Sequence, residues 1–291
     1  MQDPLISIAM VTWNGGDVLI ECMKSIHANT DLNKKPYEVI LADNCSTDGS
    51  IERVKRRFPN TKIIRYNRNH MFAKPMNDAV NMAAAPFIFL MNNDMLIDKL
   101  SFSTLIYHIN SSSDIGAVAP KLMNKDGSLQ ISCRRFPSIS NLLISGLGLD
   151  LLFPAYSWKM KTSEHKSISC VDQPMMSALL VKRECWEDVG PLDERFPLYF
   201  NDVDWCYRAK KQDWKILFVP DTWAIHYEAW SGRKLGAKQA LLSAKGLYTF
   251  FRKHHMKHKL SPEMPLIIAL SFGLAIRVYA KQVMRRGASP P

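Results

Sequence analysis

The chain has 291 residues, of which 47% are hydrophobic and 22% charged, so it can bury a sizeable core and global disorder is excluded. Its length suits one large domain or two small ones. The formal net charge of +11 lies entirely in residues 233–291, which hold 12 Lys and Arg and a single acid, Glu263. The six cysteines form no CxxC pair, which predicts free thiols in a reducing compartment and no disulfide framework.

Four apolar runs in the first third of the chain have the length and the Val, Ile and Phe content of buried strands: 7–14, 38–44, 62–66 and 87–94. Helical patterns lie between them, at residues 16–28, 49–58 and 75–85. This alternation predicts an α/β fold with a doubly wound, mainly parallel sheet.

Ligands of such sheets bind beyond the carboxyl ends of the strands, so the residues at these ends decide the site. They are polar here and are expected to meet at one edge: Trp13-Asn14, Asp43-Asn44 and Asn92-Asn93-Asp94. The chain contains neither GxGxxG after the first strand nor GxxxxGK[ST], so the glycine loops that hold phosphates in dinucleotide and P-loop folds are missing. A metal held by a carboxylate is the alternative way to neutralise a diphosphate.

Counted from Asn44, the segment ADNCSTDGS (42–50) places Ser46, Asp48 and Gly49 at positions 3, 5 and 6 of a calcium loop, but Lys55 stands at position 12, where that loop needs a bidentate Glu. A helix cap explains Asp48. Capping does not explain Asp43. An Asp at the end of a strand is well placed to accept a hydrogen bond from N3–H of uracil or thymine. Asp94 is open to two interpretations, a polar turn after a buried strand or a ligand of Mg2+ or Mn2+ that shares the metal with substrate phosphates.

The pattern changes after residue 115, where a strand, a turn at Asp126-Gly127 and a second strand are followed by strands at 177–184 and 215–220. The segment 140–170 has no clear period, and we expect a loop over the site. His226 follows the last of these strands after a short turn. A lone histidine more often has a structural role than a role as a metal ligand. His226 stays a candidate metal ligand because it lies beyond the end of a strand.

The segment LYFNDVDWC (198–206) sets two carboxylates beside aromatic residues, at the predicted start of a helix near Asn201 or Asp202. A helix cap and the favourable end of the helix dipole account for one of them. The second, Asp202, is a candidate general base, because apolar surroundings raise the basicity of a carboxylate and exclude water.

Taken in order and spacing, these motifs resemble those of family 2 glycosyltransferases, the inverting GT-A enzymes, and most closely their rhamnosyltransferase-like branch. The matching segments span about residues 5–232: VTWN (11–14), ADNCSTDGS (42–50), NRNHMFAKPMNDA (67–79), LMNND (90–94), PKLMNKDGSLQISCRRFP (120–137), SALLVKRECWEDVGPLDERFPLYFNDVDWCYR (177–208) and HYEAWSG (226–232).

The resemblance implies a donor site for a nucleoside-diphosphate sugar of the dTDP or UDP class. The residues expected to bind the nucleotide or donor are Thr12, Trp13, Asn14, Asp43, Asn44, Asn69, Asn77 and Asn93. His70, Lys74 and Pro75 replace glycines that are common in the family, so we expect a reshaped donor pocket.

The resemblance also implies a divalent metal, Mg2+ or Mn2+, with Asp94 as the acid of a degenerate DxD motif and His226 as a late ligand. Asp202 would deprotonate the acceptor hydroxyl, with Asp204 as a supporting carboxylate. Direct attack on the anomeric carbon would then invert that centre without a covalent intermediate. Asn201 stands where the family usually has Glu or Asp, which removes one charge beside the base.

We expect a GT-A domain at 1–232, with a nucleotide-sugar half at about 1–115 and an acceptor half at 116–232, and a basic helical extension at 233–291. Helices are predicted there at 235–259 and 264–284. The uncharged stretch of the second helix is only 13 residues, short of the roughly 20 that a membrane span needs. A basic amphipathic tail predicts contact with anionic lipid. An ordinary helix packed on the domain is the alternative.

These inferences predict a cytoplasmic enzyme, peripheral on the inner face of the cytoplasmic membrane, that takes part in cell-surface polysaccharide synthesis. It would move a sugar, with rhamnose as the first candidate, onto a saccharide or lipid-linked saccharide. Nucleic acid is not expected as a partner, since no recognition motif accompanies the basic charge. Two alternatives stay open, a nucleotidyltransferase of similar fold and a non-catalytic sugar- or nucleic-acid-binding module. Binding alone would need no base such as Asp202.

Overall fold

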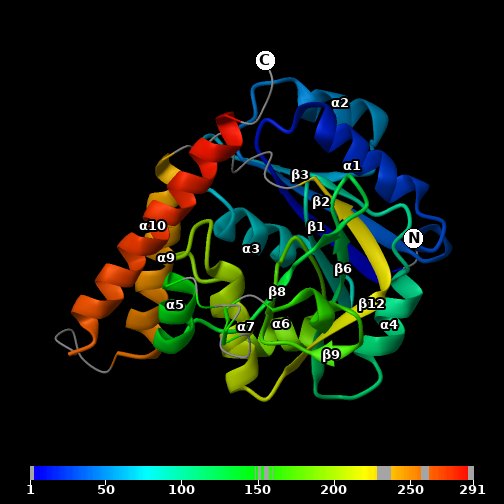
Figure 1. Cartoon of the computed structure of the whole chain (residues 1–291). Coiled ribbons are helices and arrows are strands. Elements are labelled where there is room, and N and C mark those ends of the chain that lie inside the picture. Colours follow the sequence, from blue (N-terminus) through cyan, green and yellow to red (C-terminus); the bar gives the residue numbers. More distant parts are fainter. Residues whose placement is uncertain are drawn as a thin grey trace.

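The computed structural model describes residues 3–147, 149, 152–153, 157–158, 160–227, 237–256 and 262–287. Its centre is a mixed, mainly parallel sheet covered by helices on both faces, and two long C-terminal helices lie at one side (Figure 1). The strand order is β3-β2-β1-β4-β11-β6-β12-β5. This arrangement confirms the predicted α/β fold.

The first half of the sheet is parallel, and each of its strands falls where the apolar runs predicted one. These strands are β1 (Ile6–Thr12), β2 (Tyr37–Asp43), β3 (Lys62–Arg65) and β4 (Phe87–Asn92). All seven residues of β1 are buried, as expected for a central strand with helices on both faces. The intervening helices are α1 (Gly16–Ala28), α2 (Ser50–Arg57) and α3 (Ala73–Met82).

The second half of the sheet contains β11, which runs antiparallel to both of its neighbours, β4 and β6. The longer strands here are β6 (Ile115–Met123), β11 (Ala178–Lys182) and β12 (Lys215–His226). Short edge strands complete the sheet: β5 (Met95–Leu96), β7 (Leu129–Gln130) and β9 (Ser169–Cys170). A separate pair is formed by β8 (Cys133–Arg134) and β10 (Gln173–Pro174).

Strand β12 runs well beyond the predicted 215–220. Its register with β6 shifts between Val219 and Trp223, and Pro220 lies within this irregularity, where a missing N–H is tolerated. The strand continues to His226, which pairs with Met95 of β5. The short turn expected before His226 is therefore wrong, and the histidine belongs to the sheet itself.

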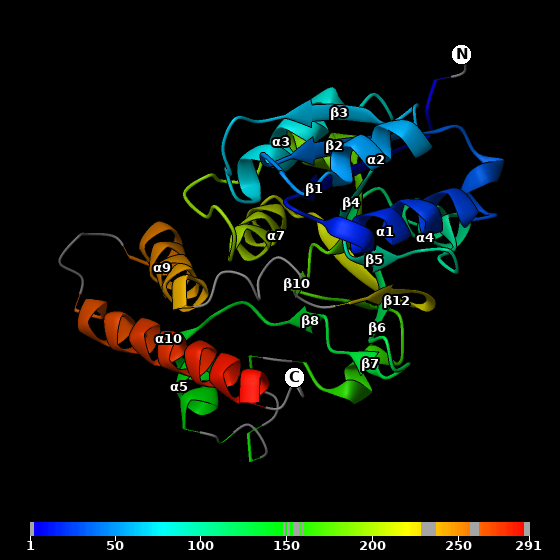
Figure 2. The same cartoon turned by 90° about the horizontal axis from the view of Figure 1, so that it is seen from above.

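Two apolar layers flank the sheet. Buried side chains of α1, α2 and α4 (Phe102–Ile109) pack on one face, and those of α3, α6 (Arg183–Val189) and α7 (Asn201–Lys211) pack on the other. A third cluster joins α7 to the C-terminal helices α9 (Ala237–His254) and α10 (Met264–Gly287) and to α5 (Ile139–Gly146). Figure 2 shows α9 beside α7 and α10 on the outer side of α9.

The segment 140–170, expected to be a loop, begins with a helix. Ser138 accepts a hydrogen bond from the Asn141 backbone, and the Asn141 side chain accepts one from the Ser138 backbone, a capping box that starts α5. Other parts of this segment, and residues 228–236 of the predicted HYEAWSG motif and tail, lie outside the described residues. Among the helices that are described, none is both long and apolar enough to cross a bilayer.

Candidate active site

The polar strand ends meet at one edge of the sheet. Thr12 lies opposite Asp43 in the pairing of β1 with β2, and the Asn44 backbone donates a hydrogen bond to the Thr12 carbonyl at 2.9 Å. Asn93, just beyond β4, donates from Nδ2 to Thr12 Oγ1 at 2.8 Å. All four side chains are buried. The convergence predicted from strand order is confirmed.

Asp43 is a fully buried carboxylate at the end of β2. Its Oδ1 accepts a hydrogen bond from the Ser46 backbone at 3.0 Å, and its Oδ2 lies 3.3 Å from Arg65 Nε. The charge is therefore paired, which burial requires. An oriented acceptor at this edge can receive an N–H of a bound base.

The turns after β1 and β2 support each other. Asn14, in a left-handed backbone conformation with φ of 48°, donates its N–H to Ser46 Oγ and accepts the Thr47 N–H at Oδ1, both at 2.8 Å. Asp48 accepts the first N–H of α1, from Gly16, and that of Ser50 at the start of α2. Asp48 therefore binds free N–H groups at the start of both helices, but the N-cap position of α2 that was predicted for it is occupied by Gly49. Trp13 precedes this turn and is half-buried.

The other predicted donor-binding asparagines hold loops. Asn44 accepts a hydrogen bond from the His70 backbone and donates one to the Met71 carbonyl, which fixes the loop after β3. Asn69 accepts from the Met71 backbone in the same loop. Asn77 is buried in α3, where its amide exchanges two hydrogen bonds of 2.9 Å with the backbone of Leu192. These contacts give Asn77 a structural task, and its role in donor binding stays a prediction.

Asp94 and His226 come from distant parts of the sequence and meet in the buried edge of the sheet. The Asp94 Oδ1 atom lies 3.3 Å from His226 Nε2. On the other side of the ring, His226 Nδ1 lies 2.7 Å from Gln130 Oε1. Since Gln130 donates its own amide nitrogen to Asn124, its oxygen faces the histidine, and Nδ1 is the protonated nitrogen.

This geometry fits a divalent cation. With Nδ1 as the donor, Nε2 of a neutral His226 is an acceptor, and it lies 3.4 Å from Asn92 Nδ2 and 3.3 Å from Asp94 Oδ1. A divalent cation held by Nε2 and the Asp94 carboxylate would take the place of the contact with Asn92. Their separation of 3.3 Å is close to the roughly 3 Å between neighbouring ligands of an octahedral Mg2+. No third His, Cys, Asp or Glu joins the pair within the part of the chain that is described, so substrate oxygens would have to complete the shell.

Asp202 lies in the first turn of α7, against β10. Its Oδ2 accepts a hydrogen bond from Gln173 Nε2 and its Oδ1 accepts the Val203 N–H, both at 2.9 Å. Burial raises the pKa of Asp202 above its ordinary value of 3.8, while the positive charge of Arg134 acts in the opposite direction. The carboxylate is therefore more basic than an exposed aspartate. The aromatic residues next to Asp202 in the sequence do not form one cluster around it. Trp205 stacks on Trp186, whereas Phe200 packs on Phe250.

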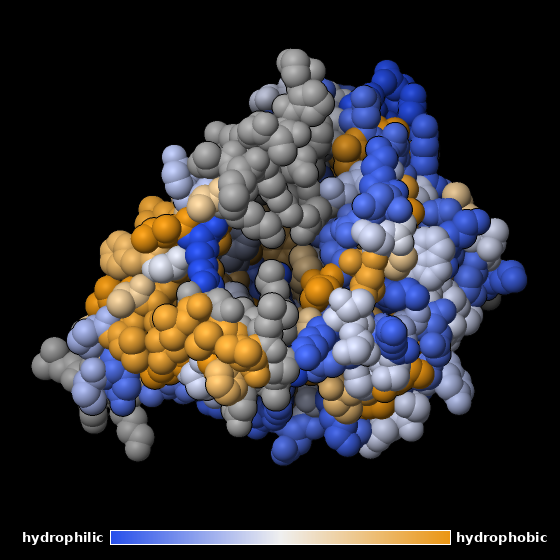
Figure 3. All heavy atoms as spheres, viewed as in Figure 1, coloured by the Kyte–Doolittle hydropathy of each residue, from blue (hydrophilic) through white to orange (hydrophobic). Residues whose placement is uncertain are grey.

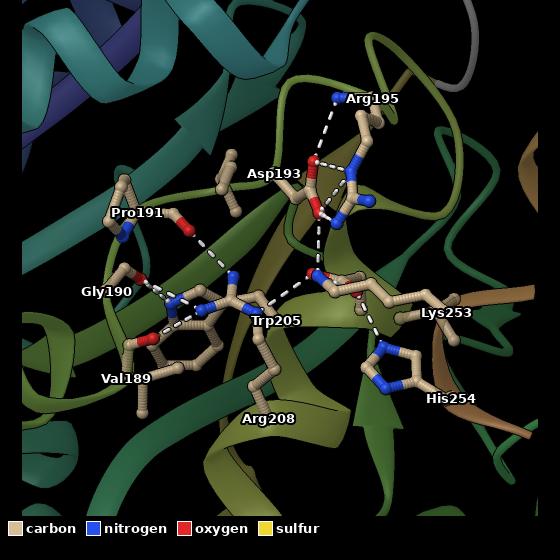
Figure 4. Close-up of polar contacts among 12 residues, drawn as sticks. Val189, Gly190, Pro191, Asp193, Arg195, Trp205, Arg208, Lys253 and His254 are labelled. Atoms are coloured by element: carbon tan, nitrogen blue, oxygen red, sulfur yellow. Dashed lines mark hydrogen bonds and ion pairs between the residues drawn. The ribbon is translucent and has the colours of Figure 1, made fainter. Parts of the chain in front are cut away.

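Asp204 is placed differently. Two successive steps of an α-helix turn through roughly 200°, so residues two apart point to nearly opposite sides. Asp204 is fully buried and bound by Arg208, Lys253 and His254 in a charged cluster between α7 and α9 (Figure 4). Burial alone raises the pKa of Asp204, but the hydrogen bonds from His254 and Lys253 and the charge of Arg208 lower it overall. These contacts bind Asp204 to α9, and its predicted role as a supporting carboxylate stays a prediction.

The sequence model described as "Glycosyl transferase family 2" matches residues 7–146, a range that contains Thr12, Asp43 and Asp94. Residues 7–146 are therefore similar to a family 2 glycosyltransferase domain. The N-acetylglucosaminyl-diphospho-decaprenol L-rhamnosyltransferase of Mycobacterium tuberculosis strain H37Rv is 26% identical over 268 residues, which cover 86% of this chain and 85% of the relative. Rhamnosyltransferase WbbL of Escherichia coli K12 is 20% identical over 239 residues, 79% of this chain and 88% of WbbL. The protein is a glycosyl-transfer enzyme similar to rhamnosyltransferases.

The fold of the chain is also found in solved structures. Mannosyltransferase PcManGT from Pyrobaculum calidifontis, in complex with GDP-Man and Mn2+, superposes with a TM-score of 0.58 at 15% identity and covers 100% of this chain and 77% of its own. The similarity shows the GT-A fold expected from the sequence.

Several residues that shape the candidate site were not predicted from the sequence. Gln130 and Gln173 each orient a candidate site residue, yet glutamine carries no signature of such a task in one sequence. Arg134 acts on the pKa of Asp202 across a separate strand pair. Lys253 and His254 belong to a helix that composition alone assigned to the basic extension.

Proposed function

We propose that the chain is a metal-dependent inverting glycosyltransferase that uses a dTDP or UDP sugar donor and a saccharide or lipid-linked saccharide acceptor. The observation that carries this proposal is the meeting of Asp94 and His226 at the sheet edge that also holds Asp43. A carboxylate and an imidazole in this arrangement suit Mg2+ or Mn2+. The Mn2+ named with the mannosyltransferase PcManGT supports the same assignment.

In this proposal the strand ends bind the donor. Asp43 accepts an N–H of the pyrimidine, and Thr12, Trp13, Asn14 and Asn93 line the nucleotide beside it. When bound, the metal neutralises the diphosphate and stabilises it as the leaving group. Asp94 and His226 are the protein residues that would hold it, and Gln130 keeps the imidazole in the tautomer whose Nε2 carries the lone pair that a cation would take over from Asn92 Nδ2.

Asp202 is the proposed general base. The acceptor hydroxyl transfers its proton to the Asp202 carboxylate as its oxygen bonds to the anomeric carbon, and the bond from that carbon to the diphosphate breaks. The displacement inverts the anomeric centre. Gln173 Nε2 and the Val203 N–H bind different oxygens of Asp202, and a carboxylate has about four acceptor positions, which leaves a lone pair for the proton. The raised pKa of Asp202 suits this role, since a stronger base is a better proton acceptor.

The sugar and the acceptor are proposed from the relatives. The Mycobacterium tuberculosis relative transfers L-rhamnose, by its name, to an N-acetylglucosaminyl-diphospho-decaprenol, and the similarity spans most of both chains. We therefore take rhamnose as the sugar and a lipid-linked saccharide of cell-surface polysaccharide synthesis as the acceptor. We keep the proposed division into a domain at 1–232 and an extension at 233–291.

A lipid-linked acceptor also gives a role to the apolar face over α5 and α10. Figure 3 shows apolar side chains gathered there. Phe272, Ile276 and Tyr279 are one helical turn apart on α10 and expose 66%, 69% and 52% of their surface, and Leu147 after α5 exposes 71%. Together with the basic charge of residues 233–291, this face suits an anionic bilayer, which supports the proposal that the enzyme lies on the inner face of the cytoplasmic membrane.

Liposome flotation tests the membrane part. We expect the full chain to float with anionic vesicles, and Phe272→Ser with Ile276→Ser to stay in the soluble fraction. Tyr107→Ser is the control, since Tyr107 exposes 72% of its surface on α4, away from this face. Equal flotation of the double variant and the control would reject the face as a lipid contact.

Calorimetric titration tests the donor site. UDP, dTDP, GDP and ADP are each titrated into the full chain, first with Mn2+ and then with EDTA. We expect one pyrimidine diphosphate to bind only when the metal is present, and Asp94→Asn to remove this binding. Binding that is equal in EDTA, or that prefers a purine, would contradict the proposal.

A further inference from the structure

Helix α9, which lies outside the family match at 7–146, contacts α7 at the turn that carries Asp202. Gly246 of α9 lies directly on Phe200, and a Cβ atom added to Gly246 would meet Phe200 Cδ2 at 2.7 Å. Phe200 has a φ of 69°, a conformation that few non-glycine residues adopt, and it immediately precedes α7. The tight fit of α9 therefore supports a strained backbone next to the proposed base.

A second contact is made by charged groups further along the same turn. Asp204 Oδ1 lies 2.7 Å from both Lys253 Nζ and His254 Nε2 of α9. Asp204 Oδ2 accepts a hydrogen bond of 2.9 Å from Arg208 Nε. Lys253 is also 2.7 Å from Asp193, so it links α9 to the loop before α7 (Figure 4). The first turn of α7 is thus tied to α9 through a carboxylate that is fully buried.

Arg208 fixes the same helix from the other side. It donates to the carbonyls of Val189, Gly190 and Pro191, in the loop after α6 (Figure 4). Arg208 belongs to α7 and cannot position that helix relative to α9. Only Lys253 and His254 do so among the described groups around Asp204, and both are largely buried.

We propose that Lys253 and His254 are positioning residues of the transfer reaction, which act through Asp204 to hold Asp202 in place. The inference rests on the proposed role of Asp202 as the base. Asp202 and Asp204 share one turn of a rigid helix, so a shift of Asp204 towards or away from α9 moves the Asp202 carboxylate as well. A misplacement of about 1 Å can slow a reaction by about 100-fold. Helix α9 is on this account part of the catalytic unit.

The test compares His254→Leu with His254→Gln in the full chain. His254→Gln keeps an N–H donor near the place of Nε2, and His254→Leu removes it. Lys253→Arg and Lys253→Met form the matched pair for the second contact. Lys55→Met, which removes an exposed positive charge on α2, is the control. For each variant we measure kcat, the KM of the donor, nucleotide affinity with Mn2+ and the thermal midpoint.

We expect His254→Leu and Lys253→Met to lower kcat by about 10- to 100-fold, with nucleotide affinity and donor KM unchanged. His254→Gln and Lys253→Arg should recover most of the lost turnover, and Lys55→Met should match the unaltered chain. Wild-type kcat in both His254→Leu and Lys253→Met would overturn the proposal. Parallel loss of nucleotide affinity, thermal midpoint and kcat, without rescue by the conservative variants, would also overturn it, because the contacts would then only stabilise the fold.

If Asp202 is not the general base, these variants give a different pattern of results. If Asp202→Asn turns over like the unaltered chain, Asp202 is not the base, whatever the variants of α9 show. If Asp202→Asn is inactive and His254→Leu is fully active, the assignment of Asp202 as the base is supported and the positioning role of His254 is rejected.

Discussion

The substitution Asp202→Asn separates the chemistry of the proposed base from its contribution to the fold. Asparagine has nearly the same shape and can still accept the Val203 N–H. Its amide nitrogen would face Gln173 Nε2, however, so two donors would meet. Gln173 Oε1 has no hydrogen-bond partner among the described residues, so the amide of Gln173 can turn over and accept from the new asparagine.

This rearrangement gives up the bond from Gln173 Nε2 to the Pro174 carbonyl. The structure therefore predicts a net loss of about one hydrogen bond, which lowers the free energy of unfolding by about 1 kcal/mol. Loss of a general base lowers turnover by about 10²- to 10⁴-fold. That range corresponds to a rise in the activation barrier of about 3 to 5 kcal/mol. The two effects differ enough to be told apart.

The assay measures release of nucleoside diphosphate at saturating donor and acceptor, next to nucleotide binding and thermal unfolding of the same preparation. Asp213→Asn is a suitable control, because Asp213 is exposed and has a φ of 62°, which asparagine tolerates. We expect Asp202→Asn to bind nucleotide normally and to lose transfer, and the control to change neither. Turnover of Asp202→Asn near that of the unaltered chain would refute the reasoning.

Three further predictions follow from contacts and pKa directions. Gln130→Leu removes the acceptor of His226 Nδ1–H, so Mn2+-dependent nucleotide affinity should fall by about 10- to 100-fold in calorimetry; an equal loss in EDTA would contradict this. The Asp202 carboxylate must be ionised to act, and Arg134 lowers its pKa, so Arg134→Met should move the acid limb of kcat/KM to higher pH, whereas a limb that stays or moves lower argues against the assignment. The pKa of Asp204 is lower in the folded chain than its ordinary 3.8, so its stabilising effect is complete above that value and disappears as the pH falls through the folded pKa. The difference in unfolding free energy between the unaltered chain and Asp204→Asn should therefore narrow in acid, and a difference independent of pH would be inconsistent with these ion pairs.

The parallel half of the sheet could be predicted because its strands are apolar runs bounded by polar residues. β1 and β4 end within one residue of the predicted polar ends, and strand order alone placed the end of β1 beside Asp43 and Asn93. The end of β12 could not be predicted in this way. The predicted strand stopped at Pro220, and only pairing with β6 on the far side of an irregularity shows that the strand continues.

The two carboxylates of α7 show why the site was only partly predictable. The sequence indicates that both Asp202 and Asp204 lie in the first turn of the helix. Helical geometry predicts that their side chains point to nearly opposite sides of this helix. What each side chain meets depends on segments far away in the sequence, Gln173 for one and His254 for the other. One sequence holds no signal for such partners, because each contact is set by tertiary packing.

The central claim is tested most directly by the stereochemistry of one turnover. The full chain is incubated with Mn2+, a dTDP- or UDP-sugar and a lipid-linked N-acetylglucosaminyl diphosphate, and the anomeric configuration of the transferred sugar is determined by NMR. The account predicts a glycoside of inverted configuration with release of nucleoside diphosphate, formed by the unaltered chain but not by Asp202→Asn. A product that retains the donor's configuration would contradict it, as would diphosphate released from a nucleoside triphosphate without any sugar transfer.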